Sequence, residues 1–569
     1  MQNRISSFRR NNSINFLIRF FFLAFVATLT VIFGYPVFGT TDDNILAGFV
    51  DGSYTGERES KLIFIRPLIG SILYITQGLL PNLGIYSLFL VLILITSFAN
   101  IGALTSIYSK NDVSRKVIDV SWLLLSIPIT TWFTLGPTYT SASMLVTLIS
   151  LLSLTMLIFS EQRKSLYLNT IFSTIFLSIG FLIRPEGGTG VILVTIPAIV
   201  LIFLQNRYIN FIKLFISLIG FFMIIGVDAL VQNQSNSSEW KEYDKWNNLR
   251  HQIQHRVSQD YLDDFREKNN WTIPEYHMFM DISFGDEKTF NTKWLQPAFE
   301  STSFTRGPKG VINANIEEVF SKVLSIFKTY PYIIFIQFFI FALILYALKT
   351  DSFTKIKIAV TIYGPILIAL LYMAATLHIP ARGVVPILYM PIIMILFISI
   401  LFDFKSRIKI GFARIMGFIL ILISIVSPSG ILDIRSKNIE NTLAAEISSS
   451  ELKLFNSKAK YIGPGNAEFY ENRNPYTNMA YWSDPIILTT GNWETFSPHW
   501  YKRLNKYGIN DRSIYRSLFE ENFYWYSHVA PDTSYIVELY LKDEGYLNVN
   551  RENLRNLPFG QAIYKFREQ

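Results

Sequence analysis

Apolar segments long enough to cross a membrane recur along this chain, and they limit its fold more than any other feature. A helix needs about 20 apolar residues to span a hydrocarbon core of about 30 Å. Hydrophobic residues make up 50% of the 569 positions and the mean hydropathy is +0.30, which is too apolar for one soluble core. The sequence predicts a mostly α, polytopic membrane protein with about eleven spans, near 16–36, 84–108, 117–135, 139–160, 166–184, 188–205, 210–231, 329–348, 355–377, 383–403 and 408–427.

The composition excludes several kinds of site. The chain has no cysteine, so a disulfide, a thiolate metal site or a cysteine nucleophile is impossible. The net charge of +8 would suit nucleic acid, but many basic residues lie in short loops between apolar segments, where they set membrane orientation. We therefore expect no nucleic-acid partner.

The distribution of basic residues predicts an orientation. The first apolar segment is longer than a signal-peptide core, and no A-x-A-like cleavage site follows it. We expect an uncleaved first span whose N-terminus is cytoplasmic, because every later basic loop then also falls on the cytoplasmic side. The residues behind this assignment are Arg4, Arg9, Arg10, Lys110, Arg115, Lys116, Arg163, Lys164, Arg207, Lys213, Lys349, Lys355, Lys357, Lys405, Arg407, Lys409 and Arg414.

The segment after the first span is expected to lie along the outer membrane surface. If Leu62 to Leu80 crossed the membrane, every later basic loop would move outside, and the segment also carries Arg66-Pro67 and Gln77. We interpret it as a helix at the interface. Apolar residues at helical spacing predict a shorter interfacial helix over 43–52, from Ile45, Leu46, Phe49 and Val50.

Two larger polar segments are placed outside by the same orientation, which divides the chain into four parts. These are an N-terminal transmembrane module (1–232), an outer helical insertion (233–328), a second transmembrane module (329–428) and an outer α/β domain (429–569). Strands are expected at 485–489 and 534–541, and a helix near 514–523. An amphipathic helix in the insertion is indicated by Trp240, Tyr243, Trp246, Leu249, Ile253 and Val257.

The unusual polar residues gather at the outer ends of the predicted spans. Ionisable residues inside spans mark ion or substrate pathways, but these spans are nearly free of them away from their ends. Simpler roles stay open for the outer group: the aspartates can solvate a helix end, Arg184 can pair with Glu186, and the last two can cap a span. The group consists of Asp42, Asp43, Arg184, Glu186, His378 and Arg382.

Two other sets of residues give weaker indications. His251 and His255 have i,i+4 spacing and could share a metal ion, but no HExxH pattern accompanies them, so a solvated helix face is the preferred interpretation. Trp493, Trp500 and Tyr501 suit sugar stacking, although the core of the small domain is the preferred use.

Several motifs resemble those of a known family. The chain begins with a basic N-terminus, one span, then TTDDN and FIRPLIGSILYITQGLLPNLGIYSLFLVLIL. This start is similar to that of bacterial polytopic glycosyltransferases of the C superfamily. LIRPEGG, which includes Arg184 and Glu186, resembles the R-x-E-G pattern of that group, and HIPARGVVPILY resembles its Arg-bearing turn into a late span. The resemblance covers most of 1–427.

The resemblance implies a fold of the glycosyltransferase C type in a bacterial inner (plasma) membrane, with the C-terminal domain outside. It also implies transfer of a sugar from a polyprenyl-phosphate donor to a glycan or lipid-linked acceptor, with Asp42 or Asp43 as base and Asp42 favoured. No second acidic motif with metal spacing follows, so a requirement for a divalent cation (Mg or Mn, held by Asp42 and Asp43 if at all) stays open.

The chemistry assigns roles to the other residues of the group. A carboxylate can take the proton of an acceptor hydroxyl during attack, the anomeric carbon passes through an oxocarbenium-like state, and cations stabilise the leaving phosphate. A single displacement would invert the anomeric configuration. We expect Glu186 to contact substrate, and the donor phosphate to meet Arg66, Arg184, His378 and Arg382.

Two alternatives belong to other classes. A transporter or flippase of lipid-linked sugars would share the spans and a basic outer site, but it predicts polar residues near the membrane midplane and paired broken helices. A membrane-anchored assembly or sensor protein would leave the aspartate pair inert.

Overall fold

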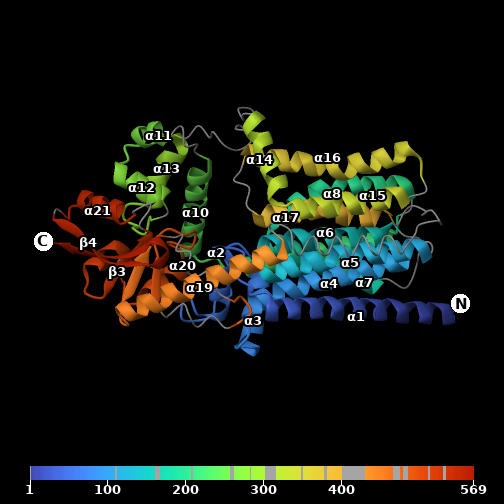
Figure 1. Ribbon diagram of the computed structural model, residues 1–569, viewed down its shortest axis with the longest axis horizontal. Coiled ribbons are helices and arrows are strands. Elements are labelled where there is room, and N and C mark those ends of the chain that lie inside the picture. Colours follow the sequence, from blue (N-terminus) through green and yellow to red (C-terminus); the bar gives the residue numbers. More distant parts are fainter. Residues whose placement is uncertain are drawn as a thin grey trace.

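The computed structural model has two halves, a bundle of long helices and a smaller body that contains a β-sheet (Figure 1). We call the second body the extramembrane half, and we count the loop after the first helix with the bundle. The structure describes residues 2–108, 112–159, 167–206, 209–256, 262–281, 283–301, 316–347, 350–376, 381–399, 430–464, 474–477, 485–510, 513–528, 533–546 and 548–568.

The bundle confirms a multi-pass, mostly α-helical membrane protein. Within the described residues, seven helices are long and apolar enough to span a membrane, or eight if the bent pair α14 (Ile316–Thr329) and α15 counts as one. The seven are α1 (Gln2–Phe33), α4 (Ile85–Tyr108), α5 (Asp112–Leu135), α6 (Tyr139–Ile158), α8 (Pro185–Asn206), α9 (Phe211–Ser235) and α16 (Ser352–Thr376). The bundle also contains α7 (Tyr167–Ile183), α15 (Pro331–Ala347) and α17 (Ala381–Ser399).

The predicted count of about eleven spans is larger than the number that the helix lengths establish. Helices α7 and α15 each have 17 residues, fewer than the roughly 20 that a perpendicular span needs. Helix α17 contains Pro386 and Pro391 and contributes only a shorter apolar stretch, Arg382–Ile395. The segment expected at 408–427 lies outside the described residues.

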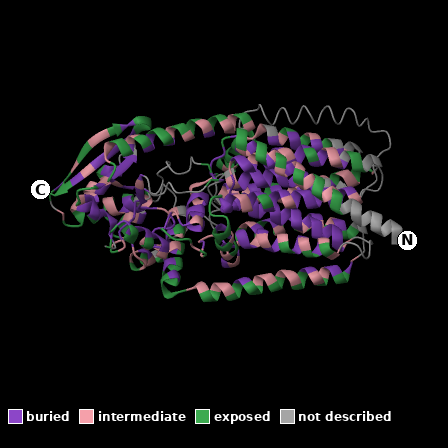
Figure 2. Ribbon diagram, turned by 90° about the horizontal axis from the view of Figure 1, so that it is seen from below, coloured by how far each residue is buried: buried purple, intermediate pink, exposed green. Residues whose placement is uncertain are grey.

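Helix α6 lies at the centre of the bundle and is buried along nearly its whole length. Figure 2 shows buried residues concentrated on the inner helices of the bundle. Helix α6 packs against α4, α7, α8 and α17. Small and hydroxyl-bearing residues let its neighbours approach closely: a Cβ at Gly180 of α7 would lie 2.9 Å from the backbone nitrogen of Thr147. Close contact through small residues is how helices associate where lipid removes the hydrophobic driving force.

The first loop after α1 contains the two expected helices. Helix α2 (Thr41–Asp51) begins at Thr40, whose hydroxyl accepts a hydrogen bond from the backbone N–H of Asp43 (3.3 Å). It is buried on nearly all sides between Asp43 and Val50, whereas an interfacial helix would bury one face. Helix α3 (Pro67–Leu79) begins at the proline, which suits the first helical position.

The extramembrane half contains α10 (Ser238–Arg256), α11 (Leu262–Lys268), α12 (Ile273–Met280), α13 (Thr292–Ser301), α19 (Ile431–Phe455), α20 (Pro498–Lys506), the 3₁₀ helices η4 (Ile514–Phe519) and η5 (Pro558–Gly560), and α21 (Thr533–Asp543). Its five-stranded mixed sheet has the order β2-β1-β3-β5-β4. Strand β1 (Lys460–Gly463) is parallel to β2 (Ile486–Thr489) and β3 (Phe523–His528), whereas β5 (Gln561–Glu568) is antiparallel to β3 and β4 (Val549–Leu557).

Two predictions for this half are confirmed and one is wrong, while the helix expected near 514–523 is the shorter 3₁₀ helix η4, which ends at Phe519. Helix α10 forms over the amphipathic segment and buries its apolar stripe from Trp240 to Ile253, while Val257 lies outside the described residues. The strand expected at 485–489 is β2. The strand expected at 534–541 is instead helix α21, because its buried side chains, at Ser534, Val537 and Leu541, recur three and four residues apart.

Helix α10 and the sheet share one hydrophobic core. The cluster joins Trp240, Tyr243 and Trp246 of α10 to Trp500 of α20 and Trp525 of β3. The indole N–H of Trp246 donates to the carbonyl of Phe290 (2.7 Å), and that of Trp500 donates to the carbonyl of Thr489 (3.0 Å). The insertion is therefore fixed against the C-terminal domain where both meet the bundle.

Candidate functional site

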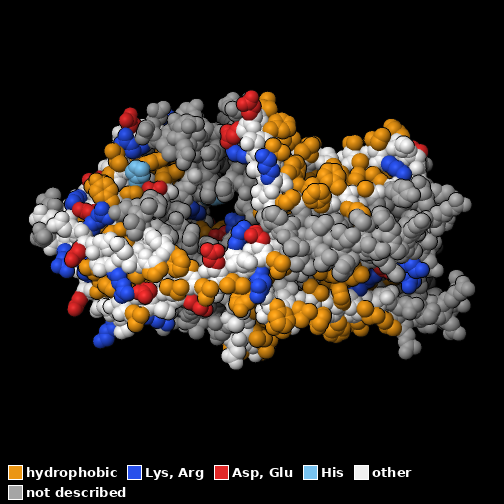
Figure 3. All heavy atoms as spheres, in the orientation of Figure 1, with side chains coloured by type: hydrophobic (Ala, Val, Ile, Leu, Met, Phe, Trp, Pro, Cys, Tyr) orange, Lys and Arg blue, Asp and Glu red, His pale blue; other side chains and the backbone are white. Residues whose placement is uncertain are grey.

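A cavity of about 710 Å³ opens where the bundle meets the extramembrane half. In the space-filling view, Lys, Arg, Asp and Glu side chains border the hollow between the two halves (Figure 3). Its lining combines residues that are far apart in the sequence. Those used below are Asp42, Lys61, Arg66, Tyr139, Arg184, Glu186, Trp240, Asp244, Arg250, His251, Arg382, Asn492 and Trp493.

Asp42 is held at the cavity by contacts from both halves. It lies in the first turn of α2, and one carboxylate oxygen forms an ion pair with Arg382 at the start of α17. The other oxygen accepts a hydrogen bond from the indole N–H of Trp493 (2.8 Å). The side chain keeps 18% of its surface exposed. Since a carboxylate can accept about four hydrogen bonds, Asp42 still has lone pairs for a ligand.

Asp43 is sealed away from the cavity, so the structure separates the two predicted acids. It is fully buried and accepts hydrogen bonds from the hydroxyls of Thr40 (2.6 Å) and Tyr86 (2.7 Å) and from the backbone N–H of Tyr139 (2.8 Å). Burial raises the pKa of Asp43 to about 6, against the opposing effect of these bonds. Asp43 joins α2 to α4 and to the N-terminus of α6, where a carboxylate is favourable.

Arg184 faces the cavity with neutral partners. Its guanidinium donates to the hydroxyls of Tyr139 (3.1 Å) and Thr140 (2.5 Å), and its backbone carbonyl accepts from Ser143 (3.0 Å). Within the described residues no ion pair joins it to Glu186, which is exposed at the cavity wall, so the alternative of a simple pair does not hold there. A half-buried guanidinium without a carboxylate partner is suited to an anionic ligand.

Of the other two predicted cations, Arg66 and His378, the structure describes only Arg66. Arg66 lines the cavity, donates to the side-chain carbonyl of Gln232 (2.6 Å) and lies 4.0 Å from Asp228 of α9. Asp228 also accepts from the backbone N–H of Leu68 (3.0 Å), which fixes the start of α3. His378 lies outside the described residues.

Arg250 is a cavity residue that the sequence did not single out. It lies on α10, is only 8% exposed, and donates to the side chains of Asn247 (2.8 Å) and Gln254 (2.6 Å). Burial lowers its pKa, and within the described residues it has no ion pair with a carboxylate. Arg250 lies four positions after Trp246 on the helix that the sequence predicts. That it faces Asp42 depends on the tertiary fold.

The cavity has more positive than negative side chains. The cations are Lys61, Arg66, Arg184, Arg250 and Arg382, and the acids are Asp42, Asp244 and Glu186. A cleft lined mainly by one sign of charge concentrates ligands of the opposite sign. The arrangement therefore suits a ligand with a phosphate or a similar anion, next to one carboxylate that can accept a proton.

The residues that the structure describes do not form a divalent-cation site. Across the described ranges, no group of three or more His, Asp or Glu side chains could hold a metal ion. Asp42 is already bound to Arg382 and Trp493, and Asp43 is sealed. His251 lines the cavity, and the side chain of His255 lies outside the described residues. We derive no step through a metal.

The three aromatic residues of the C-terminal part have different places. Trp500 is 1% exposed in the core, which confirms the preferred interpretation for that residue. Tyr501 donates a hydrogen bond to Glu287, and neither residue lines the cavity described above. Trp493 lines the cavity and lies in tilted contact with Phe64 (4.6 Å between ring centroids).

Comparisons with protein-family models, with curated proteins and with solved structures find no match for this chain. Its helices and its sheet nevertheless define its general class. The chain is a multi-pass, mostly α-helical membrane protein with a mixed five-stranded sheet in its C-terminal part.

Proposed function

We propose that this protein is an inverting glycosyltransferase that moves a sugar from a polyprenyl-phosphate donor to a glycan or lipid-linked acceptor. One observation carries the proposal: a single cavity at the end of a membrane bundle is lined by Asp42 and by arginines from distant parts of the chain, Arg66, Arg184 and Arg382. Displacement of a phosphate by a hydroxyl requires a carboxylate that accepts the hydroxyl proton and cations that stabilise the leaving phosphate.

A lipid-linked donor is supported by the surface beside the cavity. Pro67, the first residue of α3, lines the cavity. Along α3 and just beyond it, large apolar side chains are exposed, among them Ile75 (61%) and Leu79 (75%). Such a helix suits the membrane interface. A donor could keep its prenyl chain in lipid beside α3 while its phosphate reaches the cations.

The transfer needs only the groups that line the cavity. Asp42 accepts the proton of the acceptor hydroxyl as that oxygen bonds to the anomeric carbon. The bond from this carbon to the phosphate oxygen breaks, and its electron pair leaves with the phosphate, which Arg184 and Arg250 stabilise. Attack from the side opposite the phosphate inverts the anomeric configuration. Arg382 and Trp493 hold the carboxylate of Asp42 in its orientation.

We also propose a family, a membrane and an orientation for this chain on the same grounds. The chain is a member of the C superfamily with about eleven spans, in a bacterial inner membrane. Its N-terminus is cytoplasmic, and the cavity and sheet face the outside, as the basic loops predict. Glu186, exposed at the cavity wall, contacts substrate.

A flippase of lipid-linked sugars would need polar groups along a path through the bundle. Arg19 of α1 forms an ion pair with Asp119 of α5, but Asp119 lies near the start of α5, whereas the cavity lies beyond its end, so this pair does not mark the midplane. No specific observation favours the flippase over the transferase.

The experiment replaces each aspartate separately in the full-length protein in lipid nanodiscs. With Asp42→Asn, we expect sugar transfer from a polyprenyl-phosphate donor to fall by roughly 10²- to 10⁴-fold, the contribution of a general base. Asp43→Asn is the matched control and should stay within a few-fold of wild type. Undiminished transfer by Asp42→Asn would overturn the catalytic role, and donor translocation by wild type without product would identify a flippase.

A further inference from the structure

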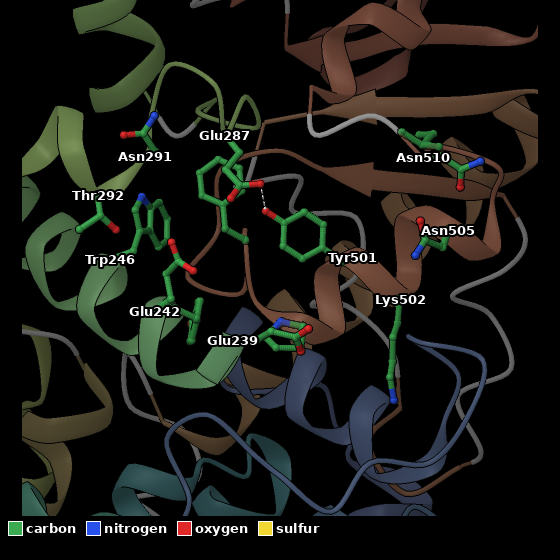
Figure 4. Close-up of a pocket in the computed structure, with 14 residues that line it drawn as sticks. Glu239, Glu242, Trp246, Glu287, Asn291, Thr292, Tyr501, Lys502, Asn505 and Asn510 are labelled. Atoms are coloured by element: carbon green, nitrogen blue, oxygen red, sulfur yellow. Dashed lines mark hydrogen bonds between the residues drawn. The ribbon is translucent and has the colours of Figure 1, made fainter. Parts of the chain in front are cut away.

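A second cavity, of about 440 Å³, lies within the extramembrane half and has the opposite charge to the first. Its volume falls in the range of about 300–1,000 Å³ that small-molecule sites occupy. Figure 4 shows its walls: Glu239 and Glu242 from α10, Glu287 from the loop before α13, and Tyr501 from α20. Nothing in the proposed transfer uses these residues.

The lining is acidic because its one cation is engaged elsewhere. Lys502 belongs to the lining, but its ammonium donates to Glu57 (2.9 Å) and Glu59 (2.8 Å) in the first loop. Figure 4 shows the Lys502 side chain extending away from Glu239, Glu242 and Glu287. Across the described residues no ion pair joins Glu239 or Glu242 to a cation, and Glu287 accepts a hydrogen bond from Tyr501.

The spacing of the carboxylates favours an organic cation over a metal ion. A metal ion needs several ligands converging within about 2–2.6 Å of one point, and no such group of acids exists among the described residues. The three glutamates instead line the cavity from two elements, Glu239 and Glu242 from α10 and Glu287 from the loop before α13. A ligand with separated positive groups could contact more than one of them.

The remaining lining suits hydroxyl groups. Asn505 and Asn510 present exposed side-chain amides, which both donate and accept hydrogen bonds. Tyr501 offers a partly exposed ring beside them, and the edge of buried Trp246 forms part of the wall. Carboxylates, amides and an aromatic face together match a ligand that has hydroxyls, amines and an apolar ring face.

We propose that this second cavity binds an oligosaccharide of amino sugars whose amines are protonated. Helix α10 separates the two sites: its Glu239 and Glu242 face this cavity, whereas Asp244 and Arg250 line the basic one. The inference does not depend on the transferase proposal, because binding can be measured without any donor.

The test compares four probes on the full-length protein in nanodiscs by isothermal titration calorimetry. They are a glucosamine tetramer, its N-acetylated form, a galacturonic acid tetramer and spermine. We expect the glucosamine tetramer to bind at least about tenfold more tightly than each of the others, because it alone combines hydroxyls with charge-assisted contacts. Equal binding of the acetylated form or of spermine, or no binding of the glucosamine tetramer, would overturn the proposal.

Matched variants locate the binding. Glu242→Gln and Glu239→Gln should each weaken the glucosamine tetramer by about tenfold, as loss of a charged hydrogen-bond partner predicts. Glu300→Gln makes the same charge change at an exposed position of α13 outside the lining and should leave affinity unchanged. Wild-type affinity in both cavity variants would show that the sugar binds elsewhere. Transfer activity in these variants tests the transferase proposal separately.

Discussion

The bundle and the extramembrane half contribute different things to the basic cavity. The bundle side supplies groups at helix starts: Asp42 follows the first residue of α2, Arg184 precedes α8, and Arg382 opens α17. The extramembrane half supplies Trp493, which binds Asp42, and Arg250, which is held by two side-chain amides on α10. The bundle thus provides charged groups at the starts of its helices, and the extramembrane half covers them.

The difference follows from the environment of each half. A helix in lipid must satisfy its backbone internally and excludes charge from its middle, so its polar chemistry moves to its ends. The extramembrane half can bury charged and aromatic groups together in a protein core, as it does for Arg250 near Trp246 and Phe284 (5.9 Å to each ring centroid). A site at the junction therefore needs both halves, and the predictions below separate their contributions.

The largest effect is expected on the bundle side. Arg184→Gln removes a positive charge that only neutral groups accompany, so affinity for a polyprenyl phosphate should fall by roughly 10- to 100-fold, the loss of one or two charge-assisted hydrogen bonds. Fluorescence-detected binding of a labelled prenyl phosphate in nanodiscs measures it. Arg58→Gln, an exposed arginine outside the lining, is the control. Equal affinity of both variants would remove Arg184 from the phosphate site.

A smaller effect is expected from the extramembrane side. Trp493→Phe keeps an aromatic ring but removes the N–H that donates to Asp42. We expect kcat for sugar transfer to fall by about tenfold with KM for the donor nearly unchanged, because the hydrogen bond orients the base and does not hold the phosphate. Steady-state kinetics separates the two constants. A rise in KM with constant kcat would place Trp493 among the donor-binding groups.

The last prediction concerns stability instead of ligand binding or catalysis, at a contact that joins the two halves. Glu494 is fully buried and accepts hydrogen bonds from Tyr54 of the first loop (3.2 Å) and from Thr489 (2.9 Å). Burial raises the pKa of Glu494 from 4.5 to about 7. The folded protein thus binds a proton that the unfolded chain has lost, and this stabilisation disappears as the pH rises from about 4.5 through about 7, by about 3 kcal/mol.

Glu494→Gln keeps the hydrogen-bond acceptor and cannot ionise, so it should flatten this part of the pH dependence. Thermal unfolding followed by tryptophan fluorescence at pH 5, 6, 7 and 8 measures it, and the stability of the variant relative to wild type should increase with pH. The comparison between the two proteins isolates Glu494 from His499, whose pKa burial lowers to about 4 and which contributes in the opposite direction. Parallel curves for the two proteins would show that Glu494 does not titrate in this range.

Some features were predictable because one local pattern dominates them. The spans, α2 and α10 follow from apolar length or from spacing at the helical period. The strand expected at 534–541 was wrong, because these residues form α21. The sequence also marked Asp42, Arg184 and Arg382 as outer-end residues, but not that Arg382 would pair with an acid 340 positions earlier.

The residues around Asp42 and Asp43 did not separate their roles, and only the resemblance favoured Asp42, whereas the structure separates the two side chains. Both residues lie in the first turn of α2, where Asp42 points into the cavity and Asp43 makes a fully buried contact with Tyr86 and Tyr139. The direction depends on how α2 packs against α4 and meets the start of α6, which are contacts between elements distant in the sequence.

The sequence by itself determined that the chain crosses a membrane several times and that its charged residues collect beyond the span ends, because lipid cannot solvate a peptide group or a charge. Only the tertiary structure decided which charges share a cavity and which face of α10 meets each cavity. Such pairings join residues hundreds of positions apart, as Trp493 joins Asp42, and they depend on the packing of whole helices rather than on any local preference.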